Sequence, residues 1–131
     1  MTNVIIDPSE FLAFEIFTQI LKSRLVEFKI NDQKSITNAD IVSGNCFLCS
    51  AALETKIGGQ DKVVELARKF KAKEIFVVEE NASDFGVSSL LGGKYIKLSI
   101  PKYSKEITPQ QNYGLQLLAS FVSEKNSTIA G

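Results

Sequence analysis

Histidine is absent from this chain of 131 residues. Its absence excludes Ser-His-Asp and Cys-His nucleophilic catalysis, histidine metal sites and histidine general bases. Any catalysis must therefore use carboxylates, lysine, a thiol, or a metal ion held by oxygen ligands. Excess charge is absent too, because 15 Lys and Arg residues balance 15 Asp and Glu residues. A net charge of zero gives no overall attraction to nucleic acid or to a membrane surface.

Long apolar runs are also missing. No stretch reaches the roughly 18 residues that a membrane-spanning helix needs. The N-terminus, "MTNVIIDPSE", lacks the basic region and the small-residue cleavage site of a signal peptide. We therefore expect a cytoplasmic protein without membrane association. The length fits one domain covering residues 1–131, and a composition of 44% apolar and 23% charged residues is ordinary for a globular fold.

Cysteine is scarce, with Cys46 and Cys49 forming one C-x-x-C pair. Such a pair can be half of a zinc site or a redox pair. This one lies inside an apolar run, without a second pair. Buried structural cysteines are the simplest interpretation, since free cysteine is often buried. A redox or metal-binding protein that uses both thiols stays an alternative.

Hydrophobic periodicity and capping residues predict helices over 7–23, 60–72 and 108–125. Strands are predicted over 24–30, 39–42, 46–56, 74–80 and 94–100, and residues 81–93 are predicted to be a loop. The strands 39–42 and 46–56 are predicted to form a hairpin around a Ser-Gly-Asn turn. The predicted architecture is an α/β fold with one small mixed central sheet flanked by helices on both sides.

Charged residues end the apolar run "CFLCSAAL" at Glu54-Thr55-Lys56. On a strand, alternation would place Glu54 and Lys56 on the same face. The preceding hairpin arm carries Asp40. Two neighbouring carboxylates can hold Mg²⁺, which prefers oxygen ligands, and the metal can activate water. A lysine beside them can orient the nucleophile or stabilise developing negative charge. The pattern predicts a metal site formed by Asp40 and Glu54.

The element order α-β-β-β-α-β, with Asp40 followed by Glu54-Thr55-Lys56, resembles the PD-(D/E)xK nuclease superfamily. Over roughly residues 7–80 the chain is most similar to archaeal Holliday-junction resolvases. The resemblance implies a restriction-endonuclease-like αβββαβ core with an extra strand and a C-terminal helix. It also implies a Mg²⁺-dependent DNA endonuclease, with Mn²⁺ as a substitute, that acts on branched or duplex DNA as a homodimer. Glu10 and Gln60 would then join Asp40, Glu54 and Lys56 in the catalytic site.

A basic stretch near the C-terminus is the candidate DNA-binding surface. Lysines would contact phosphates and tyrosines would stack on bases. Its members are Lys94, Tyr95, Lys97, Lys102, Tyr103 and Lys105. The same pattern is typical of an exposed sheet edge that lysines protect from aggregation.

The hairpin register leaves a non-catalytic alternative open. With a tight turn, Asp40 lies roughly 17 Å from Glu54, at about 3.3 Å per residue. A bulge would have to shorten this distance, or another acid such as Asp32 would have to replace Asp40. Each candidate catalytic residue also fits a structural role, as the solvated end of a strand, a helix cap or a first-turn helix residue. The alternative is a non-catalytic α/β binding or assembly module with a degenerate nuclease-like fold.

Overall fold

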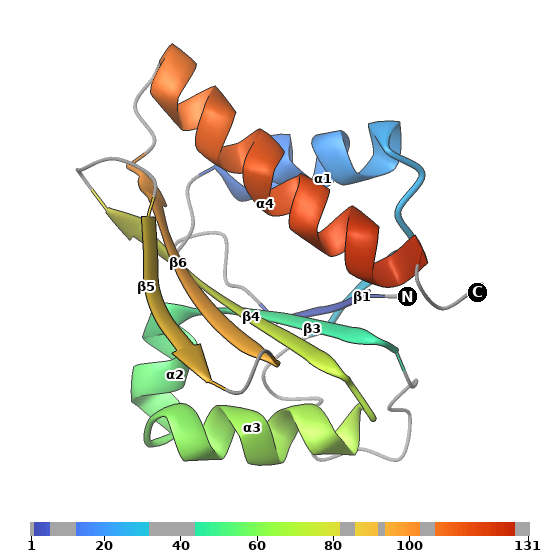
Figure 1. Cartoon of the computed structure of the whole chain (residues 1–131), viewed down its shortest axis with the longest axis vertical. Coiled ribbons are helices and arrows are strands. Elements are labelled where there is room, and N and C mark those ends of the chain that lie inside the picture. The colour runs from blue at the N-terminus through green and yellow to red at the C-terminus, as the bar shows by residue number, and fades with distance from the viewer. Residues whose placement is uncertain are drawn as a thin grey trace.

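Helices cover both faces of one central sheet in the computed structural model of the chain (Figure 1). The structure describes residues 2–5, 13–31, 44–81, 86–91, 94–102 and 107–127. The elements are β1 (Thr2–Ile5), α1 (Phe14–Ser23), β2 (Phe28–Ile30), β3 (Cys46–Ser50), α2 (Ala51–Ile57), α3 (Gln60–Lys69), β4 (Glu74–Asn81), β5 (Gly86–Leu91), β6 (Tyr95–Pro101) and α4 (Pro109–Ser127).

The strand order is β2-β1-β3-β4-β6-β5. Neighbouring strands from β2 to β6 are parallel, and β5 pairs antiparallel to β6 at one edge. This arrangement confirms an α/β fold with a mixed sheet flanked by helices. Without β5, the order is the doubly wound 2-1-3-4-5 pattern, in which the winding direction reverses between the first and third strands.

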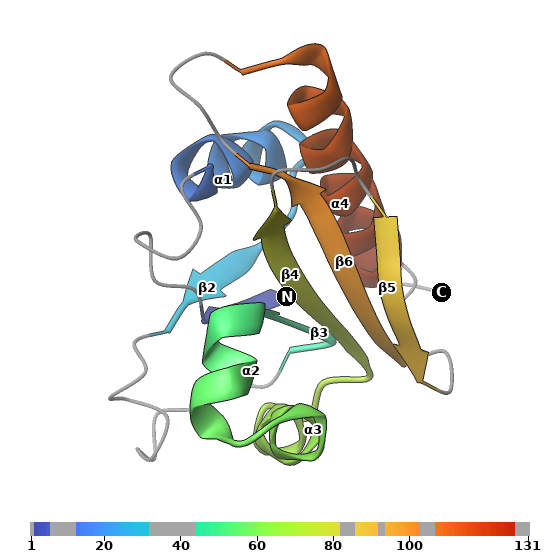
Figure 2. The ribbon, with the colours of Figure 1, turned by 90° about the vertical axis from the view of Figure 1, so that its left-hand side faces the viewer.

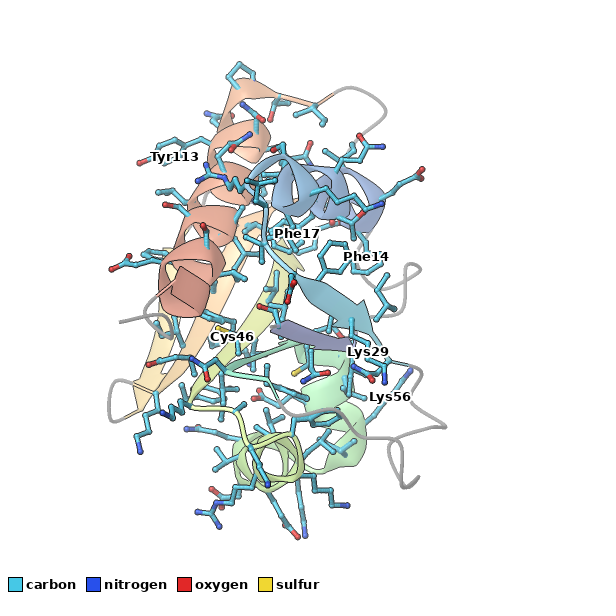
Figure 3. All side chains as sticks on the ribbon, turned by 90° about the vertical axis from the view of Figure 1, so that its right-hand side faces the viewer. Phe14, Phe17, Lys29, Cys46, Lys56 and Tyr113 are labelled. Carbon is cyan, nitrogen blue, oxygen red and sulfur yellow. The ribbon has the colours of Figure 1, made fainter. Side chains whose placement is uncertain are left out.

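Two apolar layers separate the sheet from its helices. Figure 2 shows α1 and α4 on one side of the sheet and α2 and α3 on the other. Alternation along β3 directs Cys46 toward the first layer, which lies under α1 and α4, and Cys49 toward the second layer, which lies under α2 and α3. Figure 3 shows Phe14 and Phe17 of α1 on the same side of the sheet as Cys46, which fits the first layer. The fold therefore has a separate core on each face of one sheet.

The predicted strand over 46–56 is wrong in its second half. β3 ends at Ser50, and α2 begins at Ala51. The hydroxyl of Ser50 accepts a hydrogen bond from the backbone N–H of Leu53 at 3.0 Å, which caps the helix. The residues that follow the cap, Ala-Ala-Leu-Glu, are strong helix formers. Local capping and helix propensity thus override the apolar pattern that suggested a strand.

The predicted hairpin is also wrong, because β3 lies between β1 and β4 and is parallel to both. Both edges of β3 are occupied by these neighbours, so it has no edge left for an antiparallel arm. The segment 39–42, which was predicted to be that arm, lies outside the described residues. The restriction-endonuclease-like αβββαβ order is therefore not confirmed by the described elements.

Several other boundaries differ from the sequence prediction. The strand β1, in the interior of the sheet, was not predicted because four residues are too few to show a period. The helix predicted over 7–23 is described from Phe14 onward, and β2 is three residues long. Residues 24–27, which were predicted to begin the strand, instead form the turn at the C-terminal end of α1, where the N–H of Val26 donates to the carbonyl of Leu21 at 3.0 Å. The predicted loop over 81–93 contains β5.

The predictions for α3, β4, β6 and α4 are confirmed within a few residues at each end. At the start of α4, the hydroxyl of Thr108 accepts the N–H of Gln111 at 3.1 Å, as the capping pattern predicted. The apolar stripe of α4 is buried through Leu115, Leu118 and Val122. That stripe therefore belongs to the core of this chain. Among the described helices, none is long and apolar enough to cross a membrane.

Candidate functional site

Glu54 lies on the inner side of α2 with 7% of its surface exposed, which is unusual for a glutamate. Its Oε1 atom accepts a hydrogen bond from Lys97 Nζ at 3.0 Å, and its Oε2 atom accepts one from the Tyr95 hydroxyl. Tyr95 and Lys97 are two residues apart on β6, so their side chains share the face that α2 covers. We call Glu54, Tyr95 and Lys97 the Glu54 cluster. The cluster connects α2 to β6, because Tyr95 and Lys97 follow Glu54 by 41 and 43 residues in the sequence.

Burial raises the pKa of the Tyr95 hydroxyl, and the hydrogen bond to Glu54 and the charge of that carboxylate raise it further. Burial likewise raises the pKa of the Cys49 thiol, with the negative charge of Glu54 as the second cause, while Lys97 opposes the shift. The phenol and the thiol are therefore protonated at neutral pH. A protonated, buried thiol is a poor nucleophile and a poor metal ligand.

Both cysteines, Cys46 and Cys49, are free and buried. Their burial confirms the interpretation that they are part of the core. Alternation along β3 sends the two thiols to opposite faces of the sheet, so they are in separate apolar layers. The redox alternative stays a prediction, which thiol titration tests.

Lys56 does not lie on the same side as Glu54, contrary to the prediction from strand alternation. An α-helix turns about 100° per residue, so two residues differ by roughly 200° around its axis. Lys56 is exposed on the outer side of α2, and Figure 3 shows its side chain at the margin of the molecule. The helix therefore separates the acid and the base that the motif was expected to bring together.

Gln60 is the first residue of α3, as predicted, and is partly buried. It follows Gly58 and Gly59, whose φ angles of +112° and +110° strongly favour glycine. The remaining predicted site residues lie outside the described residues: Glu10, Asp40, Tyr103 and Lys105. Within the described ranges, no group of three or more metal-ligating side chains is close enough to hold an ion.

The described members of the predicted DNA-binding stretch do not form one surface. Tyr95 is 2% exposed and bonded to Glu54, so its ring offers no face for stacking on a base. Lys97 is partly buried in its ion pair with Glu54. Lys94 and Lys102 are exposed at opposite ends of β6, roughly 26 Å apart along an extended strand. Tyr95 and Lys97 alternate along β6 because their side chains lie on the face of this strand that packs against α2.

A pocket of about 390 Å³ opens beside Tyr95, between α3 and the first residues of β4 and β6. Among the described residues, its lining is formed by Val64, Ala67, Arg68, Ala72, Lys73, Ile75, Lys94 and Tyr95. We call this the basic pocket, because Arg68, Lys73 and Lys94 are exposed cations and no carboxylate is among these residues. Tyr95 belongs both to the pocket and to the Glu54 cluster, so Glu54 holds one wall of the pocket in place.

The sequence gives little sign of the basic pocket, because Arg68 lies in the last turn of a helix and Lys73 just after it, where exposed cations are usual. A usable signal was present, because Lys73 and Lys94 each directly precede a strand. Parallel strands begin at the same edge of a sheet, so adjacent parallel strands bring such residues together. The pairing of β4 with β6, which decides this, has no local signature.

No protein-family model matches this chain, and neither do any curated protein sequences or solved structures. A function must therefore be argued from the Glu54 cluster and the basic pocket themselves.

Proposed function

We propose that this chain is a non-catalytic α/β module that functions by binding. One observation carries the proposal: both carboxylate oxygens of Glu54 accept hydrogen bonds from side chains of β6 in the protein interior. A metal-dependent nuclease mechanism built on the Glu54-Thr55-Lys56 motif requires that carboxylate as a metal ligand. Here it has a structural role.

Converting Glu54 into a metal ligand would be costly. The metal would have to displace Lys97 from a pair with an N–O distance of 3.0 Å, leaving a partly buried ammonium group beside another cation. Breaking a buried ion pair by removing one partner typically costs about 3–5 kcal/mol. The Tyr95 hydroxyl would also lose its acceptor, in a site where burial already keeps it protonated. These costs favour Glu54 as a tether between α2 and β6.

Binding is favoured by the contrast between the closed Glu54 cluster and the open basic pocket beside it. The cluster neutralises its own charges, whereas the pocket presents three cations at the surface. Concave sites with an apolar lining and a few polar groups are the usual small-molecule sites of proteins. The two features together support a module in which a rigid α2–β6 connection supports a binding pocket.

A cleavage assay tests the proposal. Purified protein is incubated with four-way junction, duplex and single-stranded DNA in the presence of Mg²⁺ or Mn²⁺. We expect no cleavage, and we expect Glu54→Gln to lower the melting temperature while the exposed Glu65→Gln on α3 leaves it unchanged. Cleavage by the wild-type protein that Glu54→Gln abolishes and Glu65→Gln retains would overturn the proposal.

The Mg²⁺-dependent endonuclease suggested by the sequence resemblance stays a prediction, which the same assay tests. It depends on Glu10 and Asp40, which lie outside the described residues. A homodimer on branched DNA would further require a second copy of the chain, and light scattering of the protein with and without a junction measures that assembly.

A further inference from the structure

We propose that the basic pocket binds a small organic phosphate, with the phosphate among Arg68, Lys73 and Lys94 and the apolar body on the pocket floor. This inference rests on the proposed function of the chain as a binding module, and it names the ligand class of that module.

Size and lining favour a small molecule. A volume of about 390 Å³ falls within the usual range of small-molecule sites. The floor is formed mainly by aliphatic side chains, from Val64, Ala67, Ala72 and Ile75, and the 2%-exposed Tyr95 contributes only a small part of its surface. A wholly hydrophilic ion such as inorganic phosphate would leave the apolar floor hydrated and would gain no stabilisation from burying it. The lining therefore selects a ligand that has an apolar or aromatic body.

Charge selects the other end of the ligand. Arg68, Lys73 and Lys94 are lining residues of the pocket, and in the described part of the chain none of them forms an ion pair with an acidic residue. The carboxylate of Glu65, one turn before Arg68 on α3, is 3.6 Å from Lys62. Three cations that line one pocket fit a phosphate monoester dianion better than a single carboxylate, and arginine can bind phosphate oxygens in a bidentate manner.

The backbone that carries the three cations is fixed by hydrogen bonds. The N–H of Lys73 bonds to the carbonyl of Asn45 at 2.8 Å, and the N–H of Ile75 bonds to the carbonyl of Lys94 at 2.7 Å. The N–H of Ala72 bonds to the carbonyl of Ala67 at 3.1 Å, which closes the end of α3. Because these positions are preorganised, binding needs to order the lysine and arginine side chains alone.

The C-terminus of α3 lies at this pocket, and its dipole disfavours an anion. Arg68 and Lys69 in the last turn counteract that partial charge. The carbonyls of Ala67 and Arg68 already accept hydrogen bonds from the turn that follows the helix. These cations therefore offset the unfavourable partial charge of the helix end.

The test uses 1-naphthyl phosphate as the probe, with 1-naphthol and inorganic phosphate as its two halves, in titration calorimetry at low ionic strength. We expect 1-naphthyl phosphate to bind at least about tenfold more tightly than either half, because each half satisfies one part of the site. Added salt should weaken binding, since the contacts are exposed and charged. Equal affinity for naphthol and naphthyl phosphate would overturn the role of the three cations.

Variants locate the site. Arg68→Gln, Lys73→Gln and Lys94→Gln should each weaken 1-naphthyl phosphate roughly tenfold, the expected effect of losing one charge-assisted hydrogen bond. The matched control is Lys69→Gln, an exposed cation one residue from Arg68 that does not line the pocket. These exposed positions should leave the melting temperature unchanged. Equal loss in Lys69→Gln would show that the probe responds to overall charge, and would overturn the pocket assignment.

Two further outcomes separate this inference from the proposed function. Folded wild-type protein that neither binds the probe nor cleaves DNA overturns the ligand class and leaves the non-catalytic proposal intact. DNA cleavage that depends on Glu54 overturns the non-catalytic proposal, whatever the probe does. A single-stranded oligonucleotide that binds more tightly than the probe and is weakened by Arg68→Gln would assign the pocket to nucleic acid and overturn the small-molecule inference.

Discussion

Replacing Glu54 with alanine removes the acceptor that Tyr95 and Lys97 share. The Tyr95 hydroxyl is then buried without its partner, and the Lys97 ammonium loses its counter-charge. Glu54→Gln is the milder change, because the amide oxygen still accepts one hydrogen bond while the ion pair is lost. Tyr95→Phe removes the hydroxyl donor and leaves the Glu54–Lys97 pair in place.

The magnitude follows from the burial of the three side chains. Breaking a buried ion pair costs about 3–5 kcal/mol when the remaining charge is shielded from water. The Lys97 side chain is 26% exposed and can turn partly toward solvent, which lowers that cost. We expect Glu54→Ala to lower the free energy of unfolding by about 3 kcal/mol, and Glu54→Gln and Tyr95→Phe by about 1–2 kcal/mol each.

Urea denaturation at pH 7 and 25 °C measures these differences, provided that the transition is two-state. A double-mutant cycle between Glu54→Gln and Tyr95→Phe should give a coupling energy of about 1 kcal/mol, because the two side chains are in direct contact. The control Glu65→Gln changes an exposed pair on α3 and should stay within about 0.5 kcal/mol of the wild type.

A small effect of Glu54→Ala would refute the role of Glu54 as a tether between α2 and β6. If Glu54→Ala changes the free energy of unfolding by less than about 0.5 kcal/mol, Glu54 behaves as a surface residue. The carboxylate would then be available to a ligand or metal, as the endonuclease mechanism requires.

The remaining predictions concern titration, thiol access and one helix end. Because burial raises the pKa of Cys49 and Tyr95, the unfolded chain loses these protons first as pH rises. The contribution of Cys49 to stability is complete below about pH 8 and that of Tyr95 below about pH 9, and above the ordinary pKa of its group each should fall by up to about 1.4 kcal/mol per pH unit; a constant urea midpoint between about pH 8 and 11 would contradict this. Both Cys46 and Cys49 should react with a thiol reagent in denaturant and much more slowly in the folded protein, and rapid native labelling would revive the redox alternative. Leu25→Gly should raise the free energy of unfolding by about 0.5–1 kcal/mol in the same assay, because Leu25 is 91% exposed and its φ of +59° is strained for any residue with a side chain. A decrease in the free energy of unfolding would contradict this account of backbone strain at Leu25.

Elements with strong local signals could be predicted from the sequence. The helices α3 and α4 follow from helical periodicity, and α4 also from its Thr108 cap; β4 and β6 are apolar runs with clear ends. These signals are contained within each segment, so they do not depend on how the segments pair. The burial of Cys46 and Cys49 was predicted for the same reason, because both belong to one apolar run.

Short apolar runs are ambiguous, and the segment 46–56 shows why. Periodicity cannot distinguish a buried strand from a buried helix over so few residues. The cap at Ser50 and the helix formers after it were the local signals that decide the case. Once the segment is divided between β3 and α2, the face shared by Glu54 and Lys56 no longer exists.

The sequence by itself determined where most helices and strands lie, and it excluded histidine chemistry. The tertiary structure alone decided which charges meet. Glu54 contacts Lys97 across 43 residues, and Lys73 and Lys94 line one pocket, because β3, β4 and β6 are neighbouring parallel strands. Parallel pairing joins distant segments through backbone hydrogen bonds that every residue type except proline can form, so no local pattern of side chains specifies it.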